Sequence, residues 1–499
     1  MTMLPVVREL VPAPLPSETV ERFAGCAHLL FLDSAATSQR LGRYSFLMAD
    51  PSVVVRSRGG RTEVSGPEGP PVTVAEDALA AVRRLLAPHT SAPVPGLPPF
   101  QGGAAGYVGY DWGLTLERLP APRFDDVALD DVALGLYDWV VAWDHATAKA
   151  WLVSTGLPET EPTARVRRAE ARADWAAARL AGHDRGRGSH SPDHSLDAVR
   201  IDAATTPRPP AYPVTGGWWP ASLDLRSSFP HADYVGVVAR VREYVYAGDI
   251  FQANISQRFE APLTEPAWAV YRRLRAHNPA PFAAYMEVPG AAIVSASPER
   301  FLQVDVSGHV ETRPIKGTRA RGVGPEHDAA LGQALTESAK DRAENLMIVD
   351  LMRNDLSRVC MPGSVRVSEL FSLERYATVH HLVSTVVGDL APGTDALDLL
   401  RVAFPGGSVT GAPKLRAMEI IAEFEPSRRG VYCGSIGYWS LTGALDTNIA
   451  IRTAVVRDGR IYFSAGGGIV ADSDPEQEYR ETLDKARAMI DVLASSEKT

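Results

Sequence analysis

The segment Arg313-Pro-Ile-Lys316-Gly-Thr-Arg319 holds one lysine between a proline and a glycine. Proline fixes the backbone on one side and glycine lets it bend on the other, so Lys316 has a defined position. A single lysine is ordinarily a flexible surface residue. Here an acid, Glu299, lies in the neighbouring segment Ser297-Pro-Glu-Arg-Phe301. An amine and an acid held in restrained turns favour a site for nucleophilic and proton-transfer chemistry.

Two segments with helical patterns supply further carboxylates. In residues 338–355, Asp341 and Glu344 are three positions apart and therefore share one face. In residues 474–485, one stripe carries Glu478, Glu481 and Lys485. A charged stripe is ordinarily a solvated helix face, but two such faces together favour a hard cation. Magnesium binds one or two carboxylates, keeps waters and accepts substrate oxygens, so Mg²⁺ is the predicted metal.

Two glycine-rich loops and one arginine suggest an anionic substrate. The loop 404–414 resembles a phosphate loop, but Pro413 precedes its lysine and no hydroxyl residue follows, so the spacing is wrong. In the loop 464–470, backbone N–H groups could hold a carboxylate or a phosphate. Arg452 stands among apolar residues of a predicted strand, 448–456. It is either paired internally or free to bind an anion, and its planar fork suits a carboxylate.

The composition excludes several classes of protein. The chain has 499 residues and a net charge of −9, with no basic run that would follow a phosphate backbone, so we expect no nucleic-acid partner. The three cysteines are far apart, which favours a reducing compartment over a disulfide framework. We find neither a signal-peptide pattern nor an apolar run long enough to cross a membrane. A cytoplasmic protein without membrane contact is therefore expected.

The N-terminal region, residues 1–156, reads as short strands with turns. Apolar runs predict strands at 29–32, 53–55 and 134–143, and residues 73–86 have a helical pattern. Glycines in 102–110 favour close packing in a sheet over a dinucleotide site, because no helix is predicted to follow.

Residues 157–225 differ in character from what precedes them. They begin with a predicted helix, 163–180, capped by Thr163, and continue as a Gly/Pro-rich linker over 183–212. Three histidines in the linker are interpreted as solvated residues rather than metal ligands.

The C-terminal region, residues 226–499, carries the candidate site. A helix over 231–247 precedes a strand over 249–259, and a second helix is predicted from Thr264, as N-cap, towards His277. Asp474 is the predicted N-cap of the last helix. Alternation in the strand places three polar side chains on one face: Gln252, Asn254 and Ser256.

Nine ordered segments resemble those of chorismate-utilising enzymes. They are SASPERF, RPIKGTRARG, AENLMIVDLMRNDLSR, TVHHLVSTVVGDL, GGSVTGAPK, YCGSIGYWS, AIRTAVV, SAGGGIV and DPEQEYRETLDKA. The family includes the large subunits of anthranilate and aminodeoxychorismate synthases, and isochorismate and salicylate synthases. The resemblance is dense over 230–495 and looser upstream. It implies an α/β fold in which two large, mainly antiparallel sheets pack as a sandwich with helices outside, and to which the N-terminal region contributes.

The resemblance also implies roles for individual residues. Glu344 and Glu481 would hold magnesium, with Asp341 and Glu478 close by. Glu299 would protonate the departing C4 hydroxyl of chorismate, and His381 would lie beside the ring. The substrate would be bound or oriented by Arg452, Tyr432, Thr410, Gly466, Gly467, Gly468, Lys485, Thr318 and Gln252.

Two positions separate members of the family. Water-using members have a lysine where this chain has Gln252, so ammonia is the expected nucleophile. Anthranilate synthases have alanine where this chain has Lys316, whose amine could add to C2 of chorismate before ammonia attacks C4. The expected product is 4-amino-4-deoxychorismate, the precursor of p-aminobenzoate and folate. Anthranilate synthesis is the alternative, and a non-catalytic subunit that senses an amino acid is a more distant one.

The resemblance implies two further ligands. No cysteine lies in a strand-turn-helix elbow with glutaminase partners, so a separate glutamine amidotransferase would supply ammonia. Related large subunits bind tryptophan through segments that appear here in altered form, at 31–34 and 278–282. Tryptophan binding is therefore an open hypothesis, and its pocket would involve Ser34, Tyr44, Ser45, Pro281 and Phe282.

Overall fold

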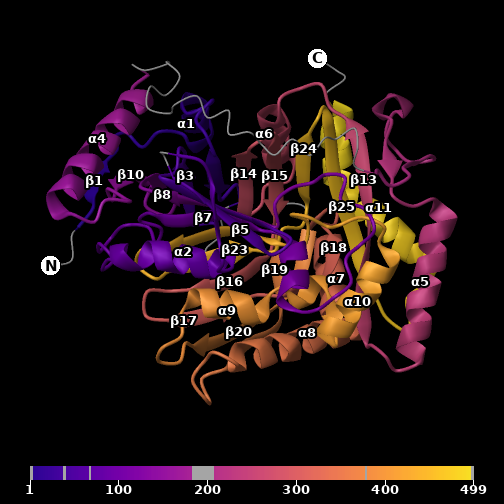
Figure 1. Cartoon of the computed structure of the whole chain (residues 1–499). Helices are drawn as coiled ribbons and strands as arrows, with labels where there is room; N and C mark the ends of the chain where they lie inside the picture. Colours follow the sequence, from indigo (N-terminus) through magenta and orange to yellow (C-terminus); the bar gives the residue numbers. More distant parts are fainter. Residues whose placement is uncertain (1–3, 37–40, 67–68, 183–206, 377–378, 496–499) are drawn as a thin grey trace.

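The computed structural model describes residues 4–36, 41–66, 69–182, 207–376 and 379–495. Over these residues the chain forms two large antiparallel sheets that pack face to face with helices outside them (Figure 1). Side chains from both sheets meet in one apolar layer, where the rings of Phe46 and Tyr438 lie 5.3 Å apart. The predicted fold class is confirmed.

Within the described residues, the first sheet has 13 strands and the second has 12. In spatial order the first contains β1 (Val6–Glu9), β10 (Lys149–Ser154), β9 (Trp139–Asp144), β3 (Tyr44–Met48), β2 (Leu30–Asp33), β14 (Phe282–Val288), β15 (Ala291–Ser297), β24 (Thr453–Arg457), β25 (Arg460–Ile469), β13 (Gln252–Pro262), β12 (Arg226–Ser227) and β11 (Tyr212–Pro213), with β21 (Gly411–Ala412) paired to β13. The second contains β18 (Ile315–Ala320), β20 (Val379–Asp389), β17 (His309–Thr312), β16 (Arg300–Val304), β23 (Leu445–Asn448), β22 (Ser435–Ser440), β7 (Gly103–Val108), β8 (Val132–Tyr137), β4 (Val53–Arg58), β5 (Arg61–Ser65) and β6 (Val72–Val74), with β19 (Arg366–Arg375) paired to β20.

Each sheet joins strands from both ends of the chain. In the first sheet β2 pairs with β14, and in the second β7 pairs with β22. The pairings of β7 explain the glycines predicted to pack closely, because a Cβ on Gly103 would lie 2.3 Å from the Trp439 carbonyl oxygen of β22 and one on Gly106 would lie 2.1 Å from the Ala133 carbonyl oxygen of β8. The N-terminal region is thus built into the sheets that carry the candidate site.

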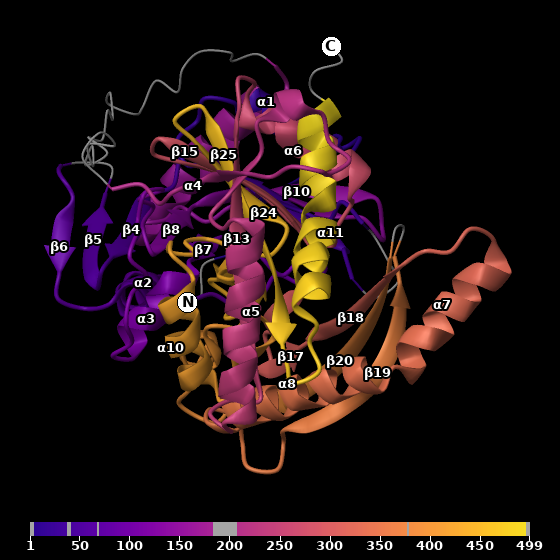
Figure 2. The ribbon, with the colours of Figure 1, turned by 90° about the vertical axis from the view of Figure 1, so that its right-hand side faces the viewer.

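Helices cover the outer surfaces of the two sheets. They are α1 (Pro16–Arg22), α2 (Ala78–Leu86), α3 (Gly113–Leu116), α4 (Pro162–Leu180), α5 (His231–Tyr246), α6 (Ala267–His277), α7 (Pro325–Glu337), α8 (Ala339–Ser357), α9 (Ala396–Ala403), α10 (Lys414–Phe424) and α11 (Pro475–Ala494). Figure 2 shows α5 and α11 side by side, with α8 below them and α7 to the right, and both α7 and α8 contact β18 and β20.

Prolines move two helix starts away from the predicted residues. Pro162 takes the first position of α4, so the cap is Glu161, whose carboxylate accepts from the next two N–H groups, rather than Thr163. Pro266 disfavours helical geometry in the residue before it, so α6 begins at Ala267 rather than near Thr264.

Three other segments also differ from the expectation. The strand predicted over 134–143 is two strands interrupted at Asp138, and the helical pattern of 73–86 begins with β6 before Asp77 caps α2. After residues 102–110 the short helix α3 follows, although none was predicted. The linker prediction for 183–206, with its three histidines, lies outside the described residues.

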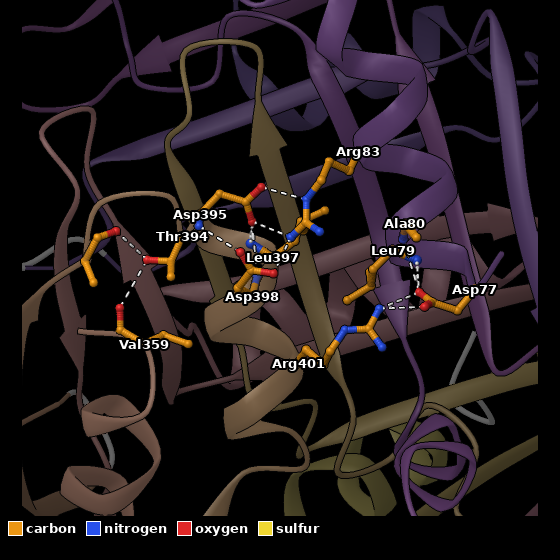
Figure 3. Close-up of polar contacts among 11 residues, drawn as sticks. Asp77, Leu79, Ala80, Arg83, Val359, Thr394, Asp395, Leu397, Asp398 and Arg401 are labelled. Atoms are coloured by element: carbon orange, nitrogen blue, oxygen red, sulfur yellow. Dashed lines mark hydrogen bonds and ion pairs between the residues drawn. The ribbon is translucent and has the colours of Figure 1, made fainter. Parts of the chain in front are cut away.

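Figure 3 shows a reciprocal link between α2 and α9. Asp77 caps α2 and accepts from Arg401 of α9, while Asp395 caps α9 and accepts from Arg83 of α2. Arg83 also donates to Asp398 at 2.6 Å. Each capping carboxylate is therefore shared with a cation from the opposite helix, which ties the N-terminal and C-terminal regions together.

Among the described helices, none is long and apolar enough to cross a membrane. All three cysteines, Cys26, Cys360 and Cys433, are buried and unpaired with one another.

Candidate active site

Lys316 points into the molecule from β18. Its side chain is buried, and its Nζ donates to the backbone carbonyl of Ser408 at 3.0 Å. The neighbouring strand β20 brings His381 opposite Thr318, with 2.9 Å between His381 Nδ1 and Thr318 Oγ1. The lysine, the histidine and the threonine thus come to one place from two adjacent strands.

The strand β18 is irregular where it carries the lysine. Its register against β20 shifts between Ile315 and Thr318, and Gly317 takes a φ of +81°. A Cβ on Gly317 would lie 2.9 Å from Asp341 Oδ1 on α8. Glycine is required here both for the backbone conformation and for the close approach of the strand to the carboxylate helix.

Burial lowers the pKa of Lys316, and the ammonium of Lys485 lowers it further. Three carboxylates, those of Glu344, Glu299 and Glu481, oppose the shift. The net direction is downwards, so a larger fraction of Lys316 is neutral at a given pH than in an exposed lysine. These interactions also place the predicted acid and both predicted metal ligands within electrostatic reach of the amine.

Glu299 lies between β15 and β16 and is 4% exposed. Burial raises its pKa to about 7, although a hydrogen bond from Ser408, the Ile315 N–H and the charges of Lys316 and Arg452 pull in the opposite direction. A carboxyl group that titrates near neutral pH can hold and release a proton there, as a general acid must.

The carboxylates of α8 and α11 face each other across Lys340. The Lys340 Nζ lies 4.0 Å from Glu344 Oε1 and 3.6 Å from Glu478 Oε1, and Lys485 pairs with Glu481 at 2.7 Å. Burial raises the pKa values of Glu344 and Glu478, and each is raised further by neighbouring carboxylates. Burial would also raise the pKa of Glu481. Nearby lysines, chiefly Lys485, outweigh this effect, so the pKa of Glu481 is lowered.

The loop predicted over 464–470 is wrong, because its glycines belong to strand β25, which pairs with β13 and packs against these carboxylates. A Cβ on Gly467 would lie 2.8 Å from Glu478 Oε2, 3.6 Å from Glu481 Oε1 and 3.7 Å from Lys485 Nζ. In the part of the chain that the structure describes, no group of three or more His, Cys, Asp or Glu residues is arranged to hold a metal ion by itself. Two carboxylates still suit magnesium, because this ion seldom uses a complete protein cage and takes its other oxygens from waters and substrate.

Arg452 lies in a turn, not in the predicted continuous strand. It separates β23 from β24 with a φ of +51°, and its carbonyl accepts from the Ala296 N–H at 3.0 Å. Burial lowers its pKa, opposed by Glu299. Among the described residues its guanidinium has no hydrogen-bond or ion-pair partner, so of the two interpretations the geometry favours a group available to an anion.

The other predicted substrate-binding residues surround this region. His381 is neutral, because burial and the charge of Arg452 lower its pKa to about 3. Thr410 is buried, and its hydroxyl donates to the Gly406 carbonyl at 3.0 Å. Gln252 is buried against Gly468, and neither atom of its amide has a partner within the described residues.

Two residues of the site were not singled out from the sequence. Ser408 contacts both Lys316 and Glu299, and Lys340 lies between the two carboxylate helices. Ser408 belongs to the GGSVTG loop, and Lys340 stands one turn before Glu344. Those positions were the available signals, but the contacts themselves arise only when the loop and α11 pack against β18 and α8.

The residues of the predicted tryptophan pocket also come together. The Ser34 N–H donates to Ser45 Oγ at 3.0 Å, and Ser34 Oγ donates to the carbonyls of Tyr44 and Pro281 at 2.6 and 3.4 Å. The carbonyl of Phe282 accepts from Asn448 at 3.0 Å. The serines already bond within the protein, so ligand binding there stays a prediction.

The chain matches the chorismate binding enzyme family over residues 28–491. It is 42% identical to aminodeoxychorismate synthase component 1 of Salmonella typhimurium, over 96% of both chains. It is also 42% identical to anthranilate synthase component 1 of Streptomyces coelicolor, over 93% of this chain and 84% of that relative. The crystal structure of anthranilate synthase component I from Streptococcus pneumoniae superposes with a TM-score of 0.72 at 30% identity, covering 91% of this chain and 93% of the other. The chain therefore belongs to the family of chorismate binding enzymes.

Proposed function

We propose that the chain is the large subunit of an aminodeoxychorismate synthase, which replaces the C4 hydroxyl of chorismate with an amino group. The observation that carries this proposal is the buried Lys316, whose pKa is lowered beside Glu299. The Salmonella relative of the same name, aligned over nearly the whole chain, supports it.

Magnesium is the proposed metal, with Glu344 and Glu481 as ligands and Asp341 and Glu478 next to them. The raised pKa of Glu344 fits this role, because a cation would relieve the repulsion among carboxylates that burial strengthens. When bound, the ion would neutralise the ring carboxylate of the substrate. Arg452, Lys485 and the Gly466–Gly468 backbone would take the remaining negative charge.

In the proposed first step, the neutral Lys316 amine adds to C2 while both ring double bonds shift towards C4. The bond from C4 to its hydroxyl breaks, and Glu299 supplies the proton with which this group leaves as water. In the second step ammonia attacks C4, both double bonds shift back and the C2–nitrogen bond breaks. The lysine nitrogen leaves as a neutral amine and the proton lost from the incoming nitrogen returns to Glu299, so the enzyme is regenerated without an external oxidant or reductant.

The nitrogen would come from a separate glutamine amidotransferase, as the words "component 1" in the names of relatives suggest. Free ammonium should replace this partner in vitro. A cytoplasmic location and tryptophan binding at the Ser34 region belong to the same proposal. Calorimetry that detects no heat with millimolar tryptophan would remove the latter.

Anthranilate synthesis is the second candidate, because the Streptomyces anthranilate synthase component is also 42% identical to this chain. Incubation of the purified chain with chorismate, magnesium and ammonium separates the candidates by product. Aminodeoxychorismate supports the proposal, anthranilate supports the second candidate, and no amino product contradicts both.

A further inference from the structure

The acids of α8 and α11 at the candidate site form a carboxylate cluster, which consists of Asp341, Glu344, Glu478 and Glu481. Lys340 contacts this cluster with a half-exposed side chain. Its Nζ lies 4.0 Å from Glu344 Oε1 on its own helix and 3.6 Å from Glu478 Oε1 on α11. The lysine side chain is 48% exposed, whereas those of the two glutamates are 15% and 4% exposed. One ammonium group thus bridges the two helices that carry the proposed magnesium ligands.

The helix α8 does not explain a lysine at this position. Lys340 is the second residue of the helix. The N-terminal end of a helix has a partial positive charge, which disfavours a cation in the first turn. A lysine four residues before a glutamate is also the weaker order for an ion pair within a helix. The carboxylates that Lys340 faces therefore explain its position better than the stability of α8 does.

The charges around Lys340 are incompletely matched. The other two carboxylates of the cluster have cations of their own, since Asp341 pairs with Arg319 at 3.0 Å and Glu481 with Lys485 at 2.7 Å. Among the described residues, Lys340 is the only cation within 4.0 Å of Glu344 or Glu478. Two carboxylates with one ammonium keep a single negative charge, which a divalent cation in place of the ammonium would neutralise.

The ammonium of Lys340 is also held loosely. Both of its distances are longer than those of hydrogen bonds from nitrogen to oxygen, which end at about 3.2 Å. In contrast, Lys414 is 12% exposed and donates to Asp355 at 2.7 Å. A half-exposed ammonium without hydrogen bonds to its partners loses little when it moves into water.

We propose that Lys340 is the counter-ion of the metal-free carboxylate cluster and that magnesium displaces it, so that this lysine sets the affinity of the site for the metal. A cation supplied by the chain itself compensates two largely buried carboxylates before the metal arrives. The same cation then competes with the metal and repels it. This inference rests on the proposed magnesium site.

The binding test uses the full chain and magnesium chloride, measured by calorimetry without chorismate. We expect Lys340→Met to lower the Kd for magnesium at least about fivefold, because the variant keeps an aliphatic stem but lacks the competing charge. The control is Arg342→Met, which removes a positive charge from the same helix, where the guanidinium lies 4.9 Å from the centre of the Phe371 ring. This control should change the Kd by less than about twofold.

Two results of this test overturn the proposal. The first is an unchanged or raised Kd in a folded Lys340→Met protein, which would mean that the lysine does not compete with the metal. The second is an equal decrease of the Kd in Arg342→Met, which would assign the effect to the overall charge of α8.

A second measurement needs no variant. A limiting amount of acetic anhydride modifies neutral amines, and an ammonium paired with carboxylates reacts slowly because it keeps its proton. Saturating magnesium should raise the modification rate of Lys340, followed by mass spectrometry, at least about twofold. Lys149 is the internal reference, because it is 52% exposed and pairs at 3.1 Å with Glu9, outside the cluster. An unchanged or lowered rate at Lys340 overturns the proposal.

The outcomes for the lysine and for the proposed function are separable. Magnesium binding without any amino product would refute the proposed function, while the two measurements would still decide the role of Lys340. If neither the unmodified protein nor Lys340→Met binds magnesium, the inference is overturned together with the proposed metal.

Discussion

Charged side chains are paired in the link between α2 and α9, but they are incompletely paired in the site around Lys316. In the link, Asp77 and Asp395 each cap a helix and each meet an arginine of the other helix (Figure 3). At the site, Lys316 and Glu299 are buried and have displaced pKa values, and the guanidinium of Arg452 has no partner within the described residues.

The difference shows where the fold has left charges for a ligand to satisfy. A paired and half-exposed charge is a structural device that water could largely replace. A buried charge with an incomplete set of partners costs stability and persists where chemistry needs it. Substitutions at the site should therefore change catalysis with little loss of stability, and substitutions in the link should do the reverse.

The largest effect is expected at Lys316. Lys316→Ala removes the proposed nucleophile and should lower aminodeoxychorismate formation by about a thousandfold or more, measured by product analysis under saturating ammonium. Lys316→Arg is the matched control, because a guanidinium keeps the positive charge but is never neutral. If the amine only holds charge, the arginine variant stays active, and the nucleophilic role is excluded. An unchanged rate and product in Lys316→Ala would exclude it too.

Glu299→Gln should slow the reaction by about 10²- to 10⁴-fold, because it removes the proton donor. In the unmodified enzyme the rate should fall as pH rises through about 7, where Glu299 loses its proton. The variant should lack this limb of the pH profile. A limb that survives in Glu299→Gln would assign the titration to another group.

The raised pKa of Glu299 also predicts how the stability of the protein changes with pH. The ordinary pKa of a glutamate is 4.5 and that of Glu299 in the folded protein is about 7, so the folded state binds more protons between these values. Its contribution to stability is full below about pH 4.5 and is lost as pH rises through about 7. Glu299→Gln should accordingly raise Tm relative to the unmodified protein at about pH 8 more than at about pH 5.

Two arginines sharpen the comparison further. Arg452→Ala should raise the KM for chorismate roughly tenfold to a hundredfold, because it removes a charged donor, while the free energy of unfolding stays level or increases. Arg429 is buried and paired with Glu425, and it also donates to the Val409 and Asn254 carbonyls. Arg429→Ala should cost about 3–5 kcal/mol of stability, measured by denaturant unfolding. Equal losses of stability in both variants would contradict the distinction.

Local signals in the sequence predicted the parts of the fold that depend on neighbours in the chain. Asp474 caps α11 as predicted, since its carboxylate needs only an N–H group three residues ahead. The strands predicted at 29–32 and 53–55 form, because their apolar side chains suit a buried sheet. The errors at Thr163 and Thr264 arose where a hydroxyl residue was preferred over the stronger constraint of a nearby proline.

The site was predictable as a set of residues and not as a geometry. Motifs pointed to Lys316, Glu299 and the carboxylates, and the structure brings these within electrostatic reach of one another. The turn at Arg452 could not be predicted, because an apolar run with one charged residue has the pattern of a strand, and the turn is evident only from the folded backbone. The same limit hid Ser408, whose carbonyl meets Lys316 from 92 residues away in the chain.

The smallest effect is expected in the link between α2 and α9. Arg83→Ala removes contacts to Asp395 and Asp398 from a side chain that is 40% exposed, so the loss should be about 0.2–1 kcal/mol per pair. The KM for chorismate and the rate should not change. Because salt screens exposed charges, the difference in unfolding free energy between Arg83→Ala and the unmodified protein should shrink as salt is raised from low to molar concentration. A difference that persists in molar salt would mean that the arginine stabilises α2 by packing of its aliphatic stem, and the link would then not be the electrostatic counterpart of the site.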